Sequence, residues 1–198
     1  MILPIIFLLI GVVCGRVFGL RIENIDTWIT AMLCVVVFAA GIDVGSKRIV
    51  FRKLREYHAK VLLIPLGTMV GSVGTGVLLG QLLGIPMNEA AAVAAGVGYY
   101  SLSAGILAGL GGPALGALTF VANILRELLS FALVPLLARY IKPQLVAIAP
   151  AGATSMDTTL GIISHCTDEE VMMMAMINGV VLSAVVPVMV PMFFRLSL

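Results

Sequence analysis

The chain has 198 residues, of which 61% are hydrophobic and only 11% are charged, and its mean hydropathy is +1.14. Soluble domains average about 45–50% apolar and about 25% charged residues. The 12 basic and 10 acidic side chains are too few to cover a water-facing surface at this length. The composition therefore excludes an ordinary soluble protein and predicts an integral membrane protein.

Charge and cysteine usage exclude further classes. The net charge is +2, and half of the basic residues lie in one loop at 47–60, which gives nucleic-acid binding little support. Cys14, Cys34 and Cys166 show no CxxC or Cys/His spacing, and neither histidine has a spaced partner. We therefore predict neither a metal site nor a cofactor.

Five apolar runs reach the length of about 20 residues that a spanning helix needs. The first run lacks a basic n-region and an A-x-A-like cleavage site, so we expect a retained helix and not a secretion signal. Polar, charged or Gly/Pro-containing sequence separates each run from the next. The runs are 1–20, 27–46, 60–84, 114–138 and 170–194.

Two segments between these runs are rich in Gly, Ala, Ser and Thr: the first broken segment at 88–113 and the second at 150–167. Irregular backbone is not tolerated in contact with lipid, so both should be broken or re-entrant helices buried within protein. The predicted fold is an all-α, polytopic membrane domain over 1–198. It consists of an N-terminal helix pair with a basic loop in 1–60 and a transport core in 60–198.

The positive-inside rule predicts that the loop at 47–60 is cytoplasmic, which places the N-terminus inside. If the first broken segment re-enters from outside, the next run delivers Arg139 and Lys142 to the cytoplasm, and the second broken segment enters from the cytoplasm. A fully spanning segment would place both charges outside. The re-entrant topology misplaces only Arg195, so we prefer it.

A short internal repeat supports this topology. The sequence GYYSL at 98–102 matches GATSM at 152–156, and an asparagine follows each, Asn123 and Asn178 respectively. Two units of broken segment plus helix that enter from opposite sides form an inverted repeat of the kind that builds secondary transporters. The two units span about 88–138 and 150–195.

Asp157 is the first candidate for a functional residue, because it lies in an apolar segment beside Thr154, Ser155 and Thr158. A carboxylate in lipid costs about 2.5–3.5 kcal/mol on insertion scales, so its presence there indicates a role in binding a solute or a proton. The alternative is a helix N-cap. In a broken helix the two roles are compatible.

A polar stripe on the run 114–138 gives four further candidates, Asn123, Arg126, Glu127 and Ser130, at positions i, i+3, i+4 and i+7. The stripe must face protein or water. A buried ion-pair network that fixes helix register and a role in transport both remain open for Arg126 and Glu127.

The remaining candidates are weaker. Asn178 could complete a site through its amide or join helices. Asp43 could bind an ion, or cap and solubilise the inner end of its helix. Hydroxyl groups of the first broken segment could line a polar cavity, and these belong to Tyr100, Ser101 and Ser103.

The motifs GVGYYSLSAGIL, FVANILRELLSFALVPLLAR and GATSMDTTLGII resemble the lysine exporter LysO family. The resemblance implies export of L-lysine, and of lysine analogues, across the cytoplasmic membrane, driven by a gradient of H⁺ or Na⁺. It also implies that Asp157, in the ATSMD motif, is a functional acid. The chain resembles the C-terminal two-thirds of the family pattern, so we expect a second copy or a small membrane partner to supply the remaining helices.

Lysine needs an anionic group for its extra ammonium and N–H donors for its carboxylate. Asp157 can supply the first, and the N-termini of broken helices can supply the second. The alternatives are a carrier of another cation or amino acid and a non-transporting assembly subunit. An intramembrane hydrolase with Ser101 or Ser155 as nucleophile is disfavoured, because the sequence has no G-x-S-x-G elbow.

Overall fold

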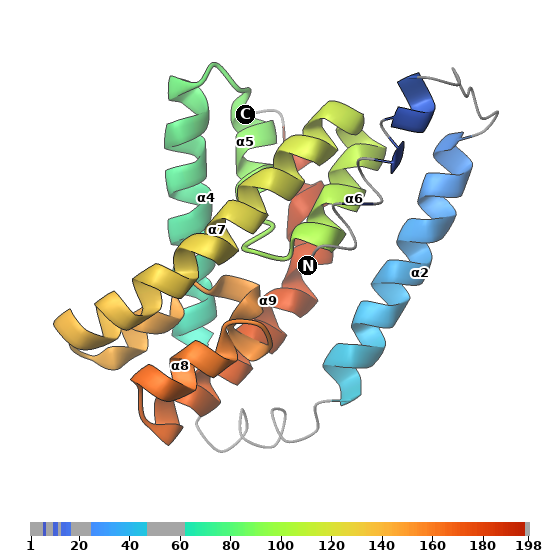
Figure 1. The fold of residues 1–198 in the computed structure, drawn as a ribbon. Helices are drawn as coiled ribbons and strands as arrows, with labels where there is room; N and C mark the ends of the chain where they lie inside the picture. Colours follow the sequence, from blue (N-terminus) through green and yellow to red (C-terminus); the bar gives the residue numbers. More distant parts are fainter. Residues whose placement is uncertain (1–5, 7–9, 12, 17–24, 47–61, 197–198) are drawn as a thin grey trace.

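The structure is a computed structural model that describes residues 6, 10–11, 13–16, 25–46 and 62–196 (Figure 1). Within these residues every regular element is a helix, which confirms the predicted all-α class. Three of them, α4 (Leu63–Leu82), α7 (Pro113–Tyr140) and α9 (Glu169–Arg195), are long and apolar enough to cross a membrane. A fourth, α2 (Ile25–Ser46), has 22 residues and rises about 33 Å.

These four helices match four of the five predicted runs to within three residues at each end. The predicted run at 1–20 and the basic loop at 47–60 lie largely or wholly outside the described residues. Large apolar side chains cover the outside of the molecule, as expected for a surface in contact with lipid, among them Leu78 and Leu79 on α4 and Leu125 and Leu129 on α7.

The first broken segment forms a hairpin of α5 (Met87–Ala94) and α6 (Tyr100–Gly111). In Figure 1, α5 runs from the upper end of α4 to the middle of the molecule, and α6 runs back up to the start of α7. The helix breaks at 95–99, where Val97 and Gly98 both have positive φ angles, +39° and +94°. The segment is therefore a broken helical hairpin whose two helices both point to the upper end of the molecule in Figure 1; its re-entry into a membrane stays a prediction.

The second broken segment contains two short helices, η3 (Gly152–Met156) and α8 (Leu160–Cys166), and a third, η2 (Gln144–Ile148), comes just before it. It approaches from the lower end in Figure 1, where α7 ends and α8 lies, while the end of α9 lies beside the start of α5, where Asn88 Nδ2 donates to the carbonyl of Phe194 at 3.0 Å. Gly152, which the sequence repeat pairs with Gly98, also has a positive φ angle of +59°. Both halves of the repeat thus turn at the matching glycine.

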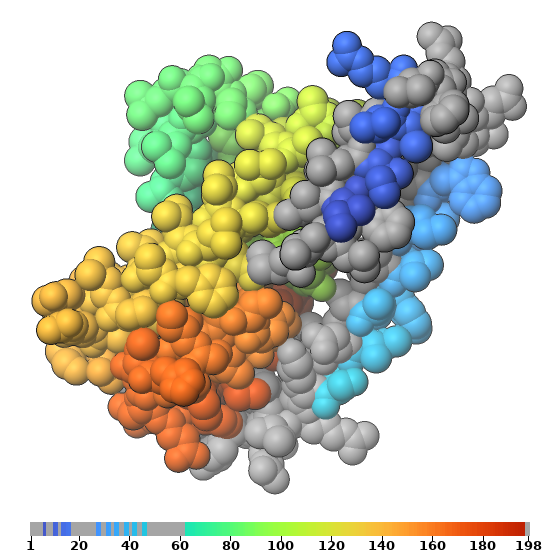
Figure 2. All heavy atoms as spheres, viewed as in Figure 1, coloured from blue at the N-terminus to red at the C-terminus, as the bar shows by residue number. Residues whose placement is uncertain are grey.

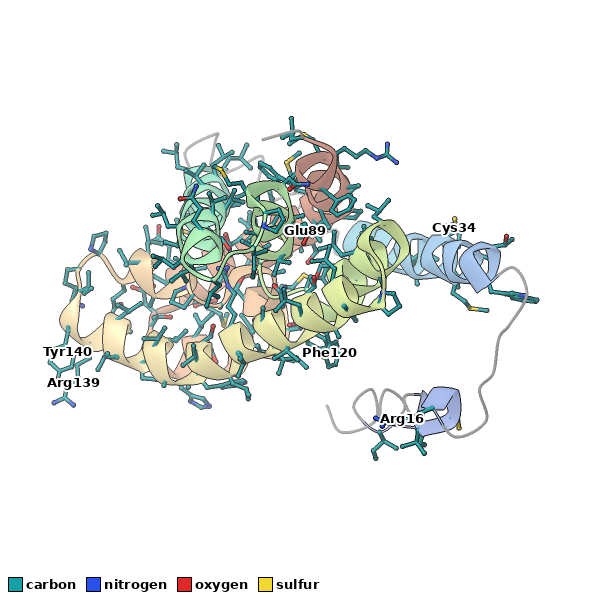
Figure 3. All side chains as sticks on the ribbon, turned by 90° about the horizontal axis from the view of Figure 1, so that it is seen from above. Arg16, Cys34, Glu89, Phe120, Arg139 and Tyr140 are labelled. Atoms are coloured by element: carbon teal, nitrogen blue, oxygen red, sulfur yellow. The ribbon has the colours of Figure 1, made fainter. Side chains whose placement is uncertain are left out.

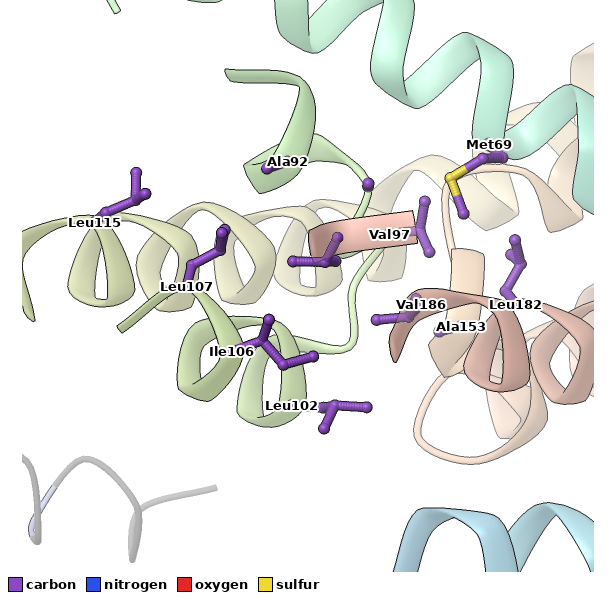
Figure 4. Close-up of a cluster of buried hydrophobic side chains, with 12 residues drawn as sticks. Met69, Ala92, Val97, Leu102, Ile106, Leu107, Leu115, Ala153, Leu182 and Val186 are labelled. Atoms are coloured by element: carbon purple, nitrogen blue, oxygen red, sulfur yellow. The ribbon is translucent and has the colours of Figure 1, made fainter. Parts of the chain in front are cut away.

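The two breaks meet in the middle of the molecule. The backbone N–H of Ala153 donates to the carbonyl oxygen of Val97 at 2.9 Å, which joins one break directly to the other. Apolar side chains from both hairpins and from α9 pack around this junction, including Leu102, Leu182 and Val186 (Figure 4). We call this contact the crossing of the two breaks.

The lower end of α7 carries an aromatic residue beside a basic one. The guanidinium carbon of Arg139 lies 5.5 Å from the centre of the Tyr140 ring, and both residues lie at the far end of α7 from Phe120 (Figure 3). Such pairs are typical of the water interface of a membrane. The opposite end of the bundle carries Glu89, near the start of α5.

Candidate functional site

A small cavity of about 160 Å³ adjoins the crossing and contains the two acids that the sequence singled out. We call it the acidic cavity. It draws on both broken segments and on both spanning helices of the repeat. Its lining residues are Gly98, Tyr99, Tyr100, Ser101, Glu127, Ala153, Thr154, Met156, Asp157, Thr158 and Ser183.

Glu127 is the buried acid of this cavity. Its side chain is 0% exposed, and among the described residues neither Oε1 nor Oε2 has a hydrogen-bond partner. A buried carboxylate without a partner is strongly unfavourable, because the desolvation of its charge is not offset. Glu127 is therefore the residue of this cavity whose burial the described contacts do not explain.

Asp157 lies on the exposed side of the same cavity. It ends η3, and its Oδ1 accepts hydrogen bonds from the backbone N–H and from the hydroxyl of Thr158. The N-cap interpretation is wrong for this residue, since the N-cap position of α8 is Thr159 and no side chain caps it. Asp157 is thus free to bind a ligand through its second oxygen, Oδ2.

The start of α6 forms another wall of the cavity through Tyr100 and the exposed Ser101. The first backbone N–H groups of a helix carry partial positive charge and bind anions. The Tyr100 ring packs edge-on against Phe120 at 5.5 Å between ring centres, which fixes α6 on α7. The start of α6 therefore brings backbone N–H groups to a cavity that two acids also line.

The other hydroxyl candidates serve the backbone. The hydroxyl of Thr154 donates to the carbonyl of Ala151, and that of Ser155 donates to the carbonyls of Gly152 and Ala175, each at 2.8 Å. Such bonds satisfy the carbonyl groups that the broken helix leaves free.

Two more hydroxyls act in the same way. Ser103 is buried, donates to the carbonyl of Tyr99 and does not line the acidic cavity. Ser130 donates to the carbonyls of Arg126 and Pro150, both at 2.8 Å.

The two asparagines hold the two breaks. The Oδ1 of Asn123 accepts from the N–H of Gly98 at 2.7 Å, and its Nδ2 donates to the carbonyls of Val93 and Thr119. The Nδ2 of Asn178 donates to the carbonyl of Gly152 at 3.0 Å. Neither asparagine lines the acidic cavity, so both position the breaks.

Arg126 faces away from the acidic cavity. Its guanidinium donates to Ser72 Oγ at 2.6 Å and to the carbonyls of Ala149 and Pro150, both at 3.1 Å. No ion pair between Arg126 and Glu127 is found. The predicted ion-pair network is therefore not found between these two residues; Arg126 joins α4, α7 and the second break through hydrogen bonds, whereas Glu127 lines the acidic cavity.

A larger hollow of about 760 Å³ lies on the Arg126 side, between α4, α5 and α7, and Figure 2 shows the surface indented between the green and yellow segments. Its lining is predominantly apolar, and among the described residues Arg126 is the one charged residue in it. The carboxylate oxygens without a partner among these residues belong instead to Glu127, in the smaller cavity. Among the described residues no group of three or more His, Cys, Asp or Glu side chains could hold a metal ion.

One cavity residue was missed in the sequence. Ser183 on α9 is 3% exposed, lines the acidic cavity, and its Oγ has no partner within the described part of the chain. The signal was weak, since a lone serine in an apolar helix usually bonds to its own backbone. Asp43 lies in the last turns of α2, but its side chain is outside the described residues.

Comparisons with known proteins agree with this architecture. A family described as lysine exporter LysO matches residues 5–194. The protein "Lysine exporter LysO" of Escherichia coli (strain K12) is 29% identical over 161 residues, which cover 81% of this chain and 53% of that protein. A "Putative lysine exporter" of Haemophilus influenzae is 32% identical over 168 residues, which cover 82% of each chain.

The match thus extends over about half the length of the Escherichia coli relative and over most of the Haemophilus one. No solved structure matches the chain significantly. The family match covers nearly all of the sequence, including both broken segments and the spanning helices α4, α7 and α9. The chain is therefore a multi-pass protein of the cytoplasmic membrane and belongs to the lysine exporter LysO family.

Proposed function

We propose that the chain is a secondary transporter, or a subunit of one, that exports L-lysine and related diamino acids. The observation that carries the proposal is Glu127, a fully buried carboxylate with no partner in the part of the chain that the structure describes, in a cavity shared with Asp157. A charge in this position is tolerated where it meets a cation or a proton during transport. The names of the two relatives supply the solute class.

Lysine matches the chemistry of the acidic cavity. Its α-ammonium and carboxylate share one carbon atom, so they bind together at the exposed side, to Asp157 and to the start of α6 near Ser101. Its ε-ammonium then extends inward to Glu127. Each formal charge of the solute thus has a partner of opposite sign.

Exchange with protons follows from the same arrangement. In this proposal the two acids of the cavity bind the ammonium groups of lysine in one half of the cycle and protons in the other. If the protein switches between inward-open and outward-open states only with lysine bound or with protons bound, lysine export is coupled to H⁺ entry.

The arrangement of the hairpins supports access from both sides of the membrane. By the positive-inside rule, the end of α7 that carries Arg139 is cytoplasmic, and α8 lies at the same end. The α5–α6 hairpin then enters from outside and the η2–α8 segment from the cytoplasm. Both reach the acidic cavity, so small movements of either hairpin would open it to one side. This inverted arrangement is part of the proposal.

A complete transporter requires additional helices in this proposal. The match covers only 53% of the Escherichia coli relative. We propose that a second copy of the chain, or a small membrane partner, completes the assembly.

The test is reconstitution of the purified chain in liposomes loaded with labelled lysine, with an outward lysine gradient and an imposed pH gradient. We expect lysine efflux that increases with inward proton force and that is lost in Asp157→Asn and Glu127→Gln. Efflux with unchanged pH dependence in both variants would contradict the mechanism. No lysine efflux by the chain, either alone or with a partner, would contradict the function.

A further inference from the structure

Two residues that line the acidic cavity carry three oxygen atoms for which no hydrogen-bond partner is found among the described residues. They are Oε1 and Oε2 of Glu127 and Oγ of Ser183, and the two residues are 0% and 3% exposed. The cavity has a volume of about 160 Å³, which is enough for a small group. The two side chains come from different helices, α7 and α9.

The number and type of these atoms define the ligand group. A primary ammonium has three N–H donors and no acceptor, and the Ser183 hydroxyl oxygen can accept while its own proton points elsewhere. Three acceptors therefore satisfy one primary ammonium completely. A planar guanidinium brings five donors in a rigid fork, and a trimethylated ammonium brings none.

We propose that Glu127 and Ser183 form a subsite that selects a primary ammonium group, with Ser183 as the residue that distinguishes it from methylated ammonium groups. This inference rests on the proposed function only for the identity of the solute as lysine. In that case the subsite binds the ε-ammonium, because Asp157 and the start of α6 take the α-carbon substituents at the exposed side.

Ser183 differs from the other buried serines near the site. The hydroxyls of Ser103, Ser130 and Ser155 all donate to backbone carbonyls, which accounts for their burial. Ser183 has no such bond among the described residues, although it is equally buried. Burying an unsatisfied hydroxyl is unfavourable, so a ligand that pairs with it gains affinity.

The experiment measures dissociation constants of L-lysine, Nε-methyl-lysine and Nα-methyl-lysine with the purified full chain. Methylation at Nε removes one of the three donors, so wild type should bind Nε-methyl-lysine about tenfold more weakly than lysine, and Nα-methyl-lysine with a smaller loss. Ser183→Ala removes one acceptor. The variant should bind lysine about tenfold more weakly and bind Nε-methyl-lysine almost as wild type does, so that the preference for lysine disappears.

Two further variants serve as controls. Ser183→Thr keeps the hydroxyl and should keep the preference for lysine. Thr119→Val alters another buried hydroxyl, which bonds only to the carbonyl of Leu115 and lies outside the acidic cavity, and should leave all three constants unchanged. If Ser183→Ala weakened the binding of lysine and of Nε-methyl-lysine equally, the serine would have only a structural role and the proposal would be overturned. The same holds if the substitution changed neither dissociation constant.

A second titration separates this inference from the proposed function. n-Butylammonium and n-butyltrimethylammonium carry only the group that the subsite recognises. Wild type should gain thermal stability with the first and not with the second, and Ser183→Ala should lose most of the difference. That result would support the subsite even if the chain moved no lysine, whereas equal responses to both ions would refute it.

Discussion

Gly152→Ala is the substitution that tests the crossing of the two breaks most directly. Gly152 has a φ angle of +59°, a region that L side chains adopt only at a cost. A Cβ atom added there would lie 2.2 Å from the carbonyl oxygen of Val97 and 3.3 Å from a guanidinium nitrogen of Arg126. The first contact is with backbone, so no side-chain rotation can relieve it.

The magnitude follows from two contributions. The left-handed conformation costs alanine about 1–2 kcal/mol. Moving the second break away from Val97 also breaks the bond from Ala153 N–H to the Val97 carbonyl, and an unmade bond in a buried site costs about 1–3 kcal/mol. We expect a loss of about 2–5 kcal/mol in stability, together with a displaced cavity wall and little remaining transport.

Gly84→Ala is the matched control. Gly84 also has a positive φ angle, +71°, but an added Cβ would meet nothing within 4 Å. Gly84→Ala should lose only the stability that the left-handed conformation costs alanine, and it should retain lysine efflux. Thermal unfolding in detergent and efflux from liposomes measure the two effects. If Gly152→Ala were no more harmful than Gly84→Ala, the close approach of the two breaks would not be part of the native structure.

Three further substitutions test neighbouring parts of the site. Glu127→Gln should abolish lysine efflux while leaving the thermal midpoint equal or higher, because no described residue bonds to the carboxyl group that it replaces. A lower midpoint would mean that Glu127 has a structural partner. Asn123→Ala should lower the free energy of unfolding by about 1–3 kcal/mol, since it leaves the Gly98 N–H without its acceptor. Unchanged stability would show that Asn123 does not stabilise the first break. Arg126→Lys keeps the charge, but a lysine cannot bond to Ser72 Oγ and both carbonyls, so the thermal midpoint should fall. An unchanged midpoint would show that only the charge of Arg126 matters.

Much of the fold could be predicted from local composition. The spanning helices were found because a run of about 20 apolar residues has few alternatives in a membrane. The two breaks were found because glycines and hydroxyl residues interrupt segments that are otherwise apolar. The match of Gly98 with Gly152 has a physical basis, since both residues adopt positive φ angles.

The site was predicted less completely. The sequence placed Arg126 and Glu127 on one stripe, but consecutive residues on a helix point about 100° apart, and here they face different hollows. Burial also differs from expectation: Glu127 is fully buried, whereas Asp157 lies on the exposed side. Ser183 was missed because its importance comes from the absence of a backbone bond, which only three-dimensional packing reveals.

The position of the acid follows from how the membrane constrains broken helices. A break exposes backbone groups that lipid cannot satisfy, so a polar side chain on a neighbouring helix must reach them. Asn123 does this for the first break, and its helix face is thereby fixed against the crossing. Glu127 lies one turn further along that face, at i+4, and so necessarily points at the junction of the two breaks. The contact of Asn123 with the first break, which makes a broken helix possible in lipid, therefore also determines where Glu127 lies.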